Sequence, residues 1–394
     1  MYKVLTLNNI SVEGLSRLPR ELYEVASEMQ HPDGIMVRSF KMHDMDIPDT
    51  VKAVGRAGAG VNNIPVDALA ARGIPVFNAP GANANAVKEL VVSGMLLAAR
   101  NLCPAWQYVQ ELEGDDAELS KKVEAGKKQF VGYELPSRTL GVLGLGAIGV
   151  QVANTALSLG MHVIGFDPQM TVQRAWELSS GVKQARSLDD LVSRCDMLTL
   201  HVPLVEGTKK LINAERIGLM SAGAVILNFS RGGIVDNDAV LAALDGDRLS
   251  AYVTDFPDRD LIGHEKVIGL PHLGASTNEA ESNCAVMVAN SLRDYLEHGI
   301  IRHSVNFPEA DIAHTDSYRL TIANENVPNM VGQISTVLGD AGLNIEDLLN
   351  KSRGDLAYTI VDLDAEVPAA TIEKLESIEG VLCVRNIGRP NDVA

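Results

Sequence analysis

A glycine-rich turn between an apolar strand-like run and a helix-like run is the feature that most limits how this chain can fold. Residues 144–149 read Gly-Leu-Gly-Ala-Ile-Gly, residues 140–143 before them read Leu-Gly-Val-Leu, and a helical pattern occupies 150–160. The next strand-like run, 162–166, ends at Asp167, whose carboxylate can accept hydrogen bonds from ribose hydroxyls. A turn in this setting is typical of the first crossover of a doubly wound parallel sheet, so the sequence predicts an α/β fold that binds a dinucleotide.

Each position of this turn has a physical role in dinucleotide binding. Gly144 permits the tight turn, Gly146 lets the backbone approach the pyrophosphate, and Gly149 brings the helix close to the sheet. The helix N-terminus at Ala147 and Ile148 offers free backbone N–H groups and a positive dipole end to the phosphates. The carboxylate that ends the next strand would repel a 2′-phosphate, so we predict NAD rather than NADP as the cofactor.

Two series of alternating strand-like and helix-like runs cover most of the 394 residues and predict two parallel sheets. The strand candidates of the first series are 3–7, 34–37, 51–54 and 74–77. Those of the second series are 139–143, 162–166, 197–202, 224–228, 250–254 and 266–269. Long helix candidates lie at 83–100 and 278–298, and the charged stretch 111–128 indicates a solvated surface crossover.

The pattern changes near residues 306–309, and a compact unit follows. Its strand candidates are 318–323, 344–351, 357–363 and 381–386, and its helix candidates are 330–341 and 368–378. The order βαββαβ is typical of a ferredoxin-like domain. The predicted fold class is therefore α/β, with two doubly wound, Rossmann- or flavodoxin-like parallel-sheet domains and a third, ferredoxin-like domain.

Charge and cysteine content exclude several classes of partner. A net charge of −17 argues against nucleic acid or an anionic membrane, although a few local cations are enough for a small anionic substrate. The four cysteines form no Cys-x-x-Cys pair, so we predict no metal site and no disulfide framework, and a cytoplasmic location. The longest apolar stretch, 90–99, is too short to span a membrane.

Three polar segments, 228–233, 255–257 and 271–277, lie at or after predicted strand ends, where doubly wound sheets bind their ligands. Oxidation of a 2-hydroxy acid needs a base with a pKa near the working pH, which His272 provides. Arg231 can hold the substrate carboxylate with two hydrogen bonds. A carboxylate bonded to the imidazole would hold its tautomer. His201, at another strand end, either lines the cofactor cleft or is structural.

Six segments in the same order along the chain resemble the D-isomer-specific 2-hydroxyacid dehydrogenases. They are residues 55–64, 73–80, 144–149, 200–204, 230–236 and 271–277. The resemblance implies a substrate-binding domain formed by residues 1–97 and completed by 284–308. It also implies a Rossmann NAD-binding domain at 98–283 and a regulatory domain at 315–394.

The resemblance is to the branch of that family that oxidises D-3-phosphoglycerate to 3-phosphohydroxypyruvate with NAD, the first step of L-serine biosynthesis. It implies that Arg231 binds the substrate carboxylate, that His272 is the acid/base, and that Asp255 lies near the nicotinamide carboxamide. The implied cofactor-binding residues are Gly144, Gly146, Ala147, Ile148, Gly149, Asp167, His201, Pro203, Phe229, Ser230, Asp255, His272 and Gly274. The implied substrate-binding residues are Arg38, Arg56, Ala57, Gly58, Lys88 and Arg231.

The chain departs from the family at the partner of the catalytic histidine. Relatives carry a Glu in an Asp-Val-Phe-x-x-Glu-Pro run, whereas residues 255–260 read Asp-Phe-Pro-Asp-Arg-Asp. An ungapped count places Asp260 at the Glu position and a gapped one places Arg259 there; we predict Asp260 as the partner, and Asp258 after it.

Two further positions, Lys88 and Arg38, have two interpretations each. Lys88 either reaches the substrate phosphate or forms a surface pair with Glu89, and Arg38 is either a substrate ligand or a surface charge. The Asn-Asn pair at 62–63 replaces the usual Asp-Asn, and the sequence alone offers no physical account of it.

Residues 318–388 resemble an ACT domain, a regulatory fold whose paired copies bind L-serine in relatives. Asn326 and Asn344 match serine-binding positions, and an amide suits a zwitterionic amino acid because it donates and accepts. Asn324 stands where His is typical, and Asn329 where Gly is typical. We therefore expect either serine feedback or a purely dimerising role, and in both cases a homo-oligomer, dimer or tetramer.

Two other functions compete with this interpretation. The first is a dehydrogenase of glycerate, hydroxypyruvate or lactate, against which Arg56 and the C-terminal domain argue. The second is a non-catalytic NAD-sensing protein on the same scaffold, supported only by the missing Glu. A substrate panel separates the first from the main interpretation, and NADH binding without turnover would indicate the second.

Overall fold

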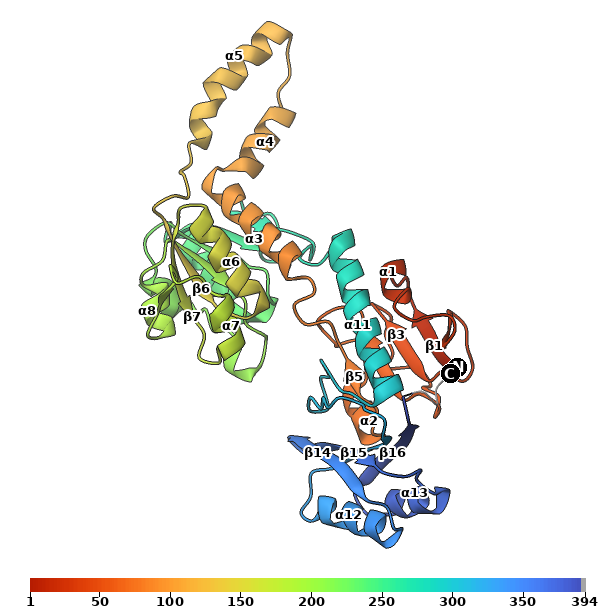
Figure 1. Ribbon diagram of the computed structural model, residues 1–394. Helices are drawn as coiled ribbons and strands as arrows, with labels where there is room; N and C mark the ends of the chain where they lie inside the picture. Colours follow the sequence, from red (N-terminus) through yellow and green to blue (C-terminus); the bar gives the residue numbers. More distant parts are fainter. Residues whose placement is uncertain (391–394) are drawn as a thin grey trace. The chain divides into compact units, whose positions relative to one another are not determined.

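The computed structural model describes residues 1–390, which form two compact units (Figure 1). Unit one consists of residues 1–83 together with the chain from 278 onward, and unit two consists of residues 84–277. Helix α3 (Ala84–Ala99) therefore belongs to unit two, whereas the predicted first domain, residues 1–97, contains nearly all of it. This helix belongs to unit two because its apolar face packs into the core of that unit. Of the predicted regulatory domain, residues 391–394 lie outside the described chain.

Unit two is built on a seven-stranded parallel sheet in the order β12-β11-β10-β9-β6-β7-β8. The strands are β6 (Thr139–Leu143), β7 (His162–Phe166), β8 (Lys183–Gln184), β9 (Met197–Leu200), β10 (Ala224–Asn228), β11 (Leu249–Thr254) and β12 (Val267–Gly269). Its other helices are α4 (Leu102–Gln110), α5 (Asp116–Gly126), α6 (Ala147–Ser158), α7 (Val172–Glu177), α8 (Leu188–Val192), α9 (Ala214–Leu219) and α10 (Asn237–Asp245). Short 3₁₀ turns are Lys127–Phe130, Glu206–Thr208 and Gly232–Ile234. Of its strands, only the two-residue β8 was not predicted.

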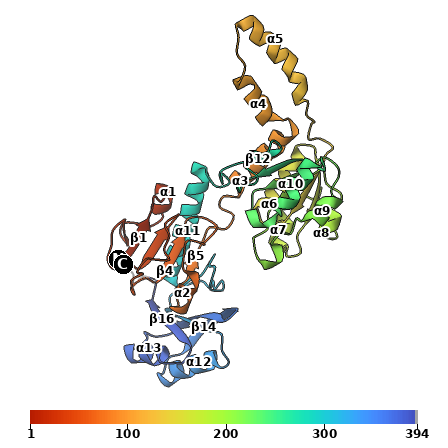
Figure 2. The ribbon, with the colours of Figure 1, turned by 180° about the vertical axis from the view of Figure 1, so that it is seen from behind.

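The charged stretch 111–128 was predicted as a surface crossover, and most of it forms helix α5 instead. The Asp115 side chain caps this helix by accepting the backbone N–H groups of Ala117 and Glu118 at 3.0 and 2.9 Å. Both ribbon views show α4 and α5 extending beyond the sheet of unit two (Figure 2). The stretch is solvated as expected, because Gly126 is the only buried residue of α5.

The first part of unit one is a five-stranded parallel sheet in the order β2-β1-β3-β4-β5. Its strands are β1 (Tyr2–Leu7), β2 (Tyr23–Ala26), β3 (Gly34–Val37), β4 (Ala53–Arg56) and β5 (Val76–Phe77). Its helices are α1 (Val12–Leu15), α2 (Val66–Ala71) and α11 (Asn278–His298). Although α11 is more than 200 residues from β1 in the sequence, it packs on this sheet and supplies much of its core.

The second part of unit one is a four-stranded antiparallel sheet in the order β14-β15-β13-β16. Its elements are β13 (Tyr318–Glu325), α12 (Met330–Asp340), β14 (Ile345–Arg353), β15 (Leu356–Leu363), α13 (Ala369–Glu376) and β16 (Val381–Gly388). This confirms the predicted βαββαβ order. The two helices cover one face, while Ala323, Tyr358 and Ile360 on the other face join the core around α11.

The C-terminal end of α11 is held by side chains from this antiparallel sheet. Arg385 donates to the carbonyl oxygens of Tyr295 and Leu296 at 3.0 and 3.1 Å, and its guanidinium lies 4.2 Å from the Tyr295 ring centre. Arg319, which is fully buried in an ion pair with Asp362, donates to the His298 carbonyl. The last carbonyls of a helix lack partners within it, so these contacts complete α11.

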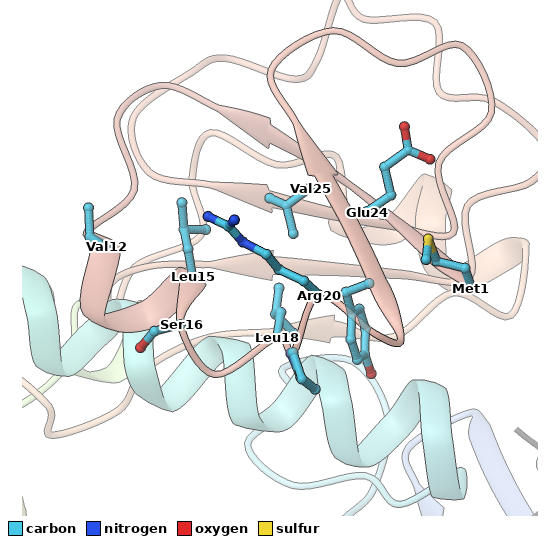
Figure 3. Close-up of a pocket in the computed structure, with 10 residues that line it drawn as sticks. Met1, Val12, Leu15, Ser16, Leu18, Arg20, Glu24 and Val25 are labelled. Atoms are coloured by element: carbon cyan, nitrogen blue, oxygen red, sulfur yellow. The ribbon is translucent and has the colours of Figure 1, made fainter. Parts of the chain in front are cut away.

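A groove with a volume of about 710 Å³ lies beside the edge strand β2 (Figure 3). Val12, Leu15, Arg20 and Val25 are among its lining residues, and none of the predicted site residues is. Within residues 1–390 no helix is long and apolar enough to cross a membrane.

Candidate active site

The glycine turn predicted from the sequence connects β6 to the N-terminus of α6. Gly144 adopts a φ of +90°, which only glycine tolerates well. A Cβ on Gly149 would lie 1.9 Å from the Gly144 carbonyl oxygen, so this glycine allows the helix to pack against the turn. A Cβ on Gly146 would meet nothing within 4 Å, so the backbone there is open to a ligand. This geometry suits a pyrophosphate at the first turn of α6, as predicted.

Asp167 follows β7 and supports the same turn. One carboxylate oxygen accepts the Leu145 backbone N–H at 2.8 Å, and the other accepts the Gln169 N–H at 2.8 Å. A carboxylate offers about four acceptor positions, so two stay available for ribose hydroxyls. Asp167 therefore fits its predicted role and also holds the glycine turn in place.

His201, after β9, has a buried nitrogen with no hydrogen-bond partner. Its Nε2 lies 3.0 Å from Thr199 Oγ1, whereas Nδ1 has no partner within residues 1–390. Burial lowers the pKa of His201 to about 3, so the ring is neutral. The His201 carbonyl borders Gly144, which places this residue beside the glycine turn. An unsatisfied nitrogen is costly when buried, so this position suits a ligand and favours the cofactor-cleft interpretation.

Arg231 is presented by a turn that Asn228, at the end of β10, stabilises. The Asn228 amide donates to the Arg231 carbonyl at 2.9 Å and accepts the Ser230 N–H at 3.2 Å. The Ser230 hydroxyl donates to the Leu200 carbonyl, which ties this turn to the neighbouring strand β9. The Arg231 guanidinium donates to the Ser230 carbonyl at 2.7 Å and forms no ion pair with another described residue. It is therefore available to an anionic ligand.

Asp255, at the end of β11, anchors the loop that carries His272. Its two carboxylate oxygens accept the backbone N–H groups of Leu273 and Gly274, both at 2.8 Å. Asp255 is only 2% exposed, and His272 has a left-handed φ of +56°. The position of Asp255 near a carboxamide stays a prediction, and its observed contacts give it a role in positioning the histidine loop.

The ring of His272 contacts an aromatic side chain and no carboxylate among residues 1–390. Its centre lies 4.7 Å from that of Phe256. The Asp260 side chain is exposed and forms no ion pair with any residue of the described chain, 1–390. Asp258 instead accepts the Leu261 N–H at 3.2 Å and a hydrogen bond from Asn237, so it caps a local turn. The predicted pairing of Asp260 with His272 therefore stays a prediction.

The predicted anion-binding residues of unit one gather at the ends of β3 and β4. Arg56 Nε donates to the Arg38 carbonyl at 3.1 Å, and the Ala57 N–H donates to the Val37 carbonyl at 2.8 Å. A Cβ on Gly58 would lie 1.8 Å from Arg56 Nη1, so glycine makes room for the guanidinium. The structure thus brings Arg38, Arg56, Ala57 and Gly58 together.

Two residues that contact Arg38 were not predicted from the sequence. Glu281, in the first turn of α11, forms an ion pair with the Arg38 guanidinium. Asn63 donates from its side chain to the carbonyls of Phe40 and Arg38 at 2.8 and 3.3 Å, which gives the second asparagine of the Asn-Asn pair a structural role. The sequence held no local signal for Glu281, because 243 positions separate it from Arg38.

Lys88 lies in unit two, on α3, and its Nζ is 3.7 Å from Glu89 Oε1. The contact agrees with the surface-pair interpretation, although the lysine side chain is only 19% exposed and the glutamate is largely exposed. Pro203 and Phe229 lie after β9 and β10, where they were expected, and Phe229 packs against Gly94 of α3.

The two predicted effector residues lie at opposite ends of the antiparallel sheet. Asn326 is bonded through its backbone N–H to the Asp355 carbonyl, just before β15. Asn344 is bonded through its N–H to the Asp364 carboxylate, just after β15. The eight residues of β15 span roughly 25 Å, so one amino acid cannot contact both amides within a single chain.

Comparison with known proteins shows the family to which this chain belongs. Residues 92–274 match the family model described as the NAD-binding domain of D-isomer specific 2-hydroxyacid dehydrogenases. A D-3-phosphoglycerate dehydrogenase of Haemophilus influenzae is 35% identical over 345 residues, which cover 84% of this chain and 80% of that protein. The chain belongs to the D-3-phosphoglycerate dehydrogenase family. This confirms the predicted family.

Two other 3-phosphoglycerate dehydrogenases are also similar to this chain. The one from Methanocaldococcus jannaschii is 35% identical over 364 residues, which cover 89% of this chain and 65% of that protein. The solved NAD⁺-bound 3-phosphoglycerate dehydrogenase of Entamoeba histolytica has a TM-score of 0.58 and 25% identity, covering 77% of this chain and 98% of that one. The predicted fold class and the predicted cofactor, NAD, are confirmed. The ACT resemblance of residues 318–388 stays a prediction.

Proposed function

We propose that this chain oxidises D-3-phosphoglycerate to 3-phosphohydroxypyruvate. The observation that supports it best is the cluster of Arg38 and Arg56 at the strand ends of unit one, in a chain similar to D-3-phosphoglycerate dehydrogenases over most of its length. A substrate with a phosphate and a carboxylate needs more cations than glycerate or lactate does. This argues against the unphosphorylated alternatives.

The roles of the remaining residues follow from their chemistry. Bound NAD supplies the hydride acceptor. Arg231 holds the carboxylate of the substrate, and His272 removes the proton of the C2 hydroxyl. Asp255 fixes the backbone beside that histidine. For the carboxylate that orients the imidazole we keep Asp260, whose exposed side chain has no competing ion pair among the described residues.

NADH absorbance during oxidation of D-3-phosphoglycerate, and during reduction of 3-phosphohydroxypyruvate, tests the proposal. Turnover in both directions, with poor turnover of D-glycerate and D-lactate, is the expected result. Turnover of an unphosphorylated acid alone would reassign the substrate. NADH binding without any turnover would favour the sensing protein, for which the absence of the family's Glu from residues 255–260 is the one supporting observation.

We further propose that the active form is a homo-oligomer and that L-serine binds between two C-terminal domains. Because Asn326 and Asn344 lie a strand length apart, a ligand of both must contact one amide from each of two copies. Millimolar L-serine should then reduce turnover; unaffected turnover would leave these domains a dimerising role.

All four cysteines are free, as suits the reducing cytoplasm that we propose as the location.

A further inference from the structure

The Arg38 guanidinium already has an anionic partner inside unit one. Glu281 of α11 contacts it, and the two side chains are 39% and 37% exposed. An exposed ion pair of this kind is weak. It changes the equilibrium constant between the paired and the separated side chains by up to about fivefold. A ligand of higher charge can therefore replace the carboxylate at small cost.

A second feature stabilises Glu281 when it is not bound to Arg38. It lies in the first turn of a 21-residue helix, where the positive end of the helix dipole favours a carboxylate. The exchange of partners would therefore not leave the carboxylate in an unfavourable position.

The other charges nearby show how compact this arrangement is. Arg56 donates to the Arg38 backbone, and the positive charges of both arginines act on the thiol of Cys284, one turn along α11 from Glu281. Burial raises the pKa of this thiol, the arginines lower it, and Glu281 raises it. The charges of Arg38, Arg56 and Glu281 therefore all act within one small region of unit one.

We propose that Glu281 is a displaceable counter-ion, which holds the Arg38 guanidinium in the empty enzyme and is replaced by the substrate phosphate. This inference rests on the proposed function. A phosphate dianion binds a guanidinium through two charge-assisted hydrogen bonds and carries twice the charge of a carboxylate. Glu281 is then a positioning residue, and it affects only ligands that use Arg38.

The variant Glu281→Gln tests this, because the amide keeps the shape and removes the charge. The KM for D-3-phosphoglycerate should fall about two- to fivefold, with kcat and the KM for NAD unchanged. The KM for D-glycerate, which has no phosphate to reach Arg38, should not change. The matched control is Glu279→Gln, an exposed carboxylate of the same helical turn, which should leave every constant unchanged.

A double-mutant cycle with Arg38→Ala separates the ion pair from a general charge effect. In that background Glu281→Gln should no longer lower the KM for D-3-phosphoglycerate. An equal decrease in both backgrounds, an unchanged KM or an increased one would each overturn the inference while leaving the proposed reaction intact. Failure of the proposed reaction itself is distinct, since the unmodified enzyme would then not oxidise D-3-phosphoglycerate.

Discussion

Residues that touch no substrate carry much of the organisation of the candidate site. Asp255 uses both carboxylate oxygens to hold the loop of His272, and Asn228 shapes the turn of Arg231. The sequence pointed to the positions of the reacting groups because they follow strand ends. It could not show which atoms of Asp255 were already engaged, or that Glu281 meets Arg38, because those contacts depend on the folded chain.

Substitution of Asp255 by Asn should disturb the histidine loop. An amide can accept only one of the two backbone N–H groups, and its own NH₂ group would face the other. We expect kcat to fall roughly tenfold, the effect of losing one charge-assisted hydrogen bond, with the melting temperature little changed. Steady-state kinetics measure this, with the exposed Asp238→Asn as the control. An unchanged kcat would show that one anchor is enough.

The pKa of His201 predicts how the stability of the ligand-free protein depends on pH. The folded-state pKa of about 3 lies below the ordinary value of 6.5, so between these values the unfolded chain binds the extra proton. This residue therefore makes the free energy of unfolding decrease as the pH falls from 6.5 toward 3. Urea unfolding at pH 7 and pH 5 should show a smaller loss for His201→Gln than for the unmodified protein. The same loss in both would contradict the burial of this ring; His162→Gln, at an exposed position, is the control.

The bounds of helices and strands were predicted well where apolar and polar residues follow a clear strand or helix pattern. Strands β3, β6, β7 and β10 and helix α11 have their predicted bounds. The edge strand β2 was missed, because only Tyr23 is fully buried in it and its apolar signal is weak. Helix α5 was missed because its charge suggested a crossover, although Asp115 followed by Glu118 is the kind of spacing that begins a helix.

Helix α11 depends on a different part of the chain for its C-terminal end. Arg385→Met should keep the apolar contact with the Tyr295 ring and remove two hydrogen bonds to helix carbonyls. We expect a loss of about 2–3 kcal/mol in the free energy of unfolding of unit one. Denaturant unfolding measures it, and Arg17→Met, at an exposed position of the same unit, should have almost no effect. Equal stabilities of the two variants would mean that the helix end does not need its cap.

At the scale of the whole molecule, the division of the chain follows packing more than sequence order. Helix α11 joins the N-terminal sheet because its apolar side chains complete that core, and α3 joins unit two for the same reason. The family resemblance gave the split arrangement in outline. The boundary at α3 could not be read from the sequence, because an apolar helix can pack equally well on either neighbour.

The proposed homo-oligomer leads to a prediction for α4. Leu102, Trp106 and Val109 recur on one face of this helix and are 45%, 68% and 48% exposed. Such a row of exposed apolar side chains is typical of a surface that is covered in an assembly. Trp106→Glu should therefore lower the molecular mass measured by light scattering. Trp176→Glu, at an exposed position on α7, is the control, and an unchanged mass in both would place the assembly contact elsewhere.

The contacts at the end of α11 also limit how domains of this family can be exchanged. A foreign domain grafted in place of residues 315–390 would bring its own ligand specificity but not Arg319, Tyr358 and Arg385. The carbonyls of Tyr295, Leu296, His298 and Gly299 would then lose these donors. A working chimera must therefore inherit these three side chains, or the native sheet that presents them, together with the dehydrogenase half.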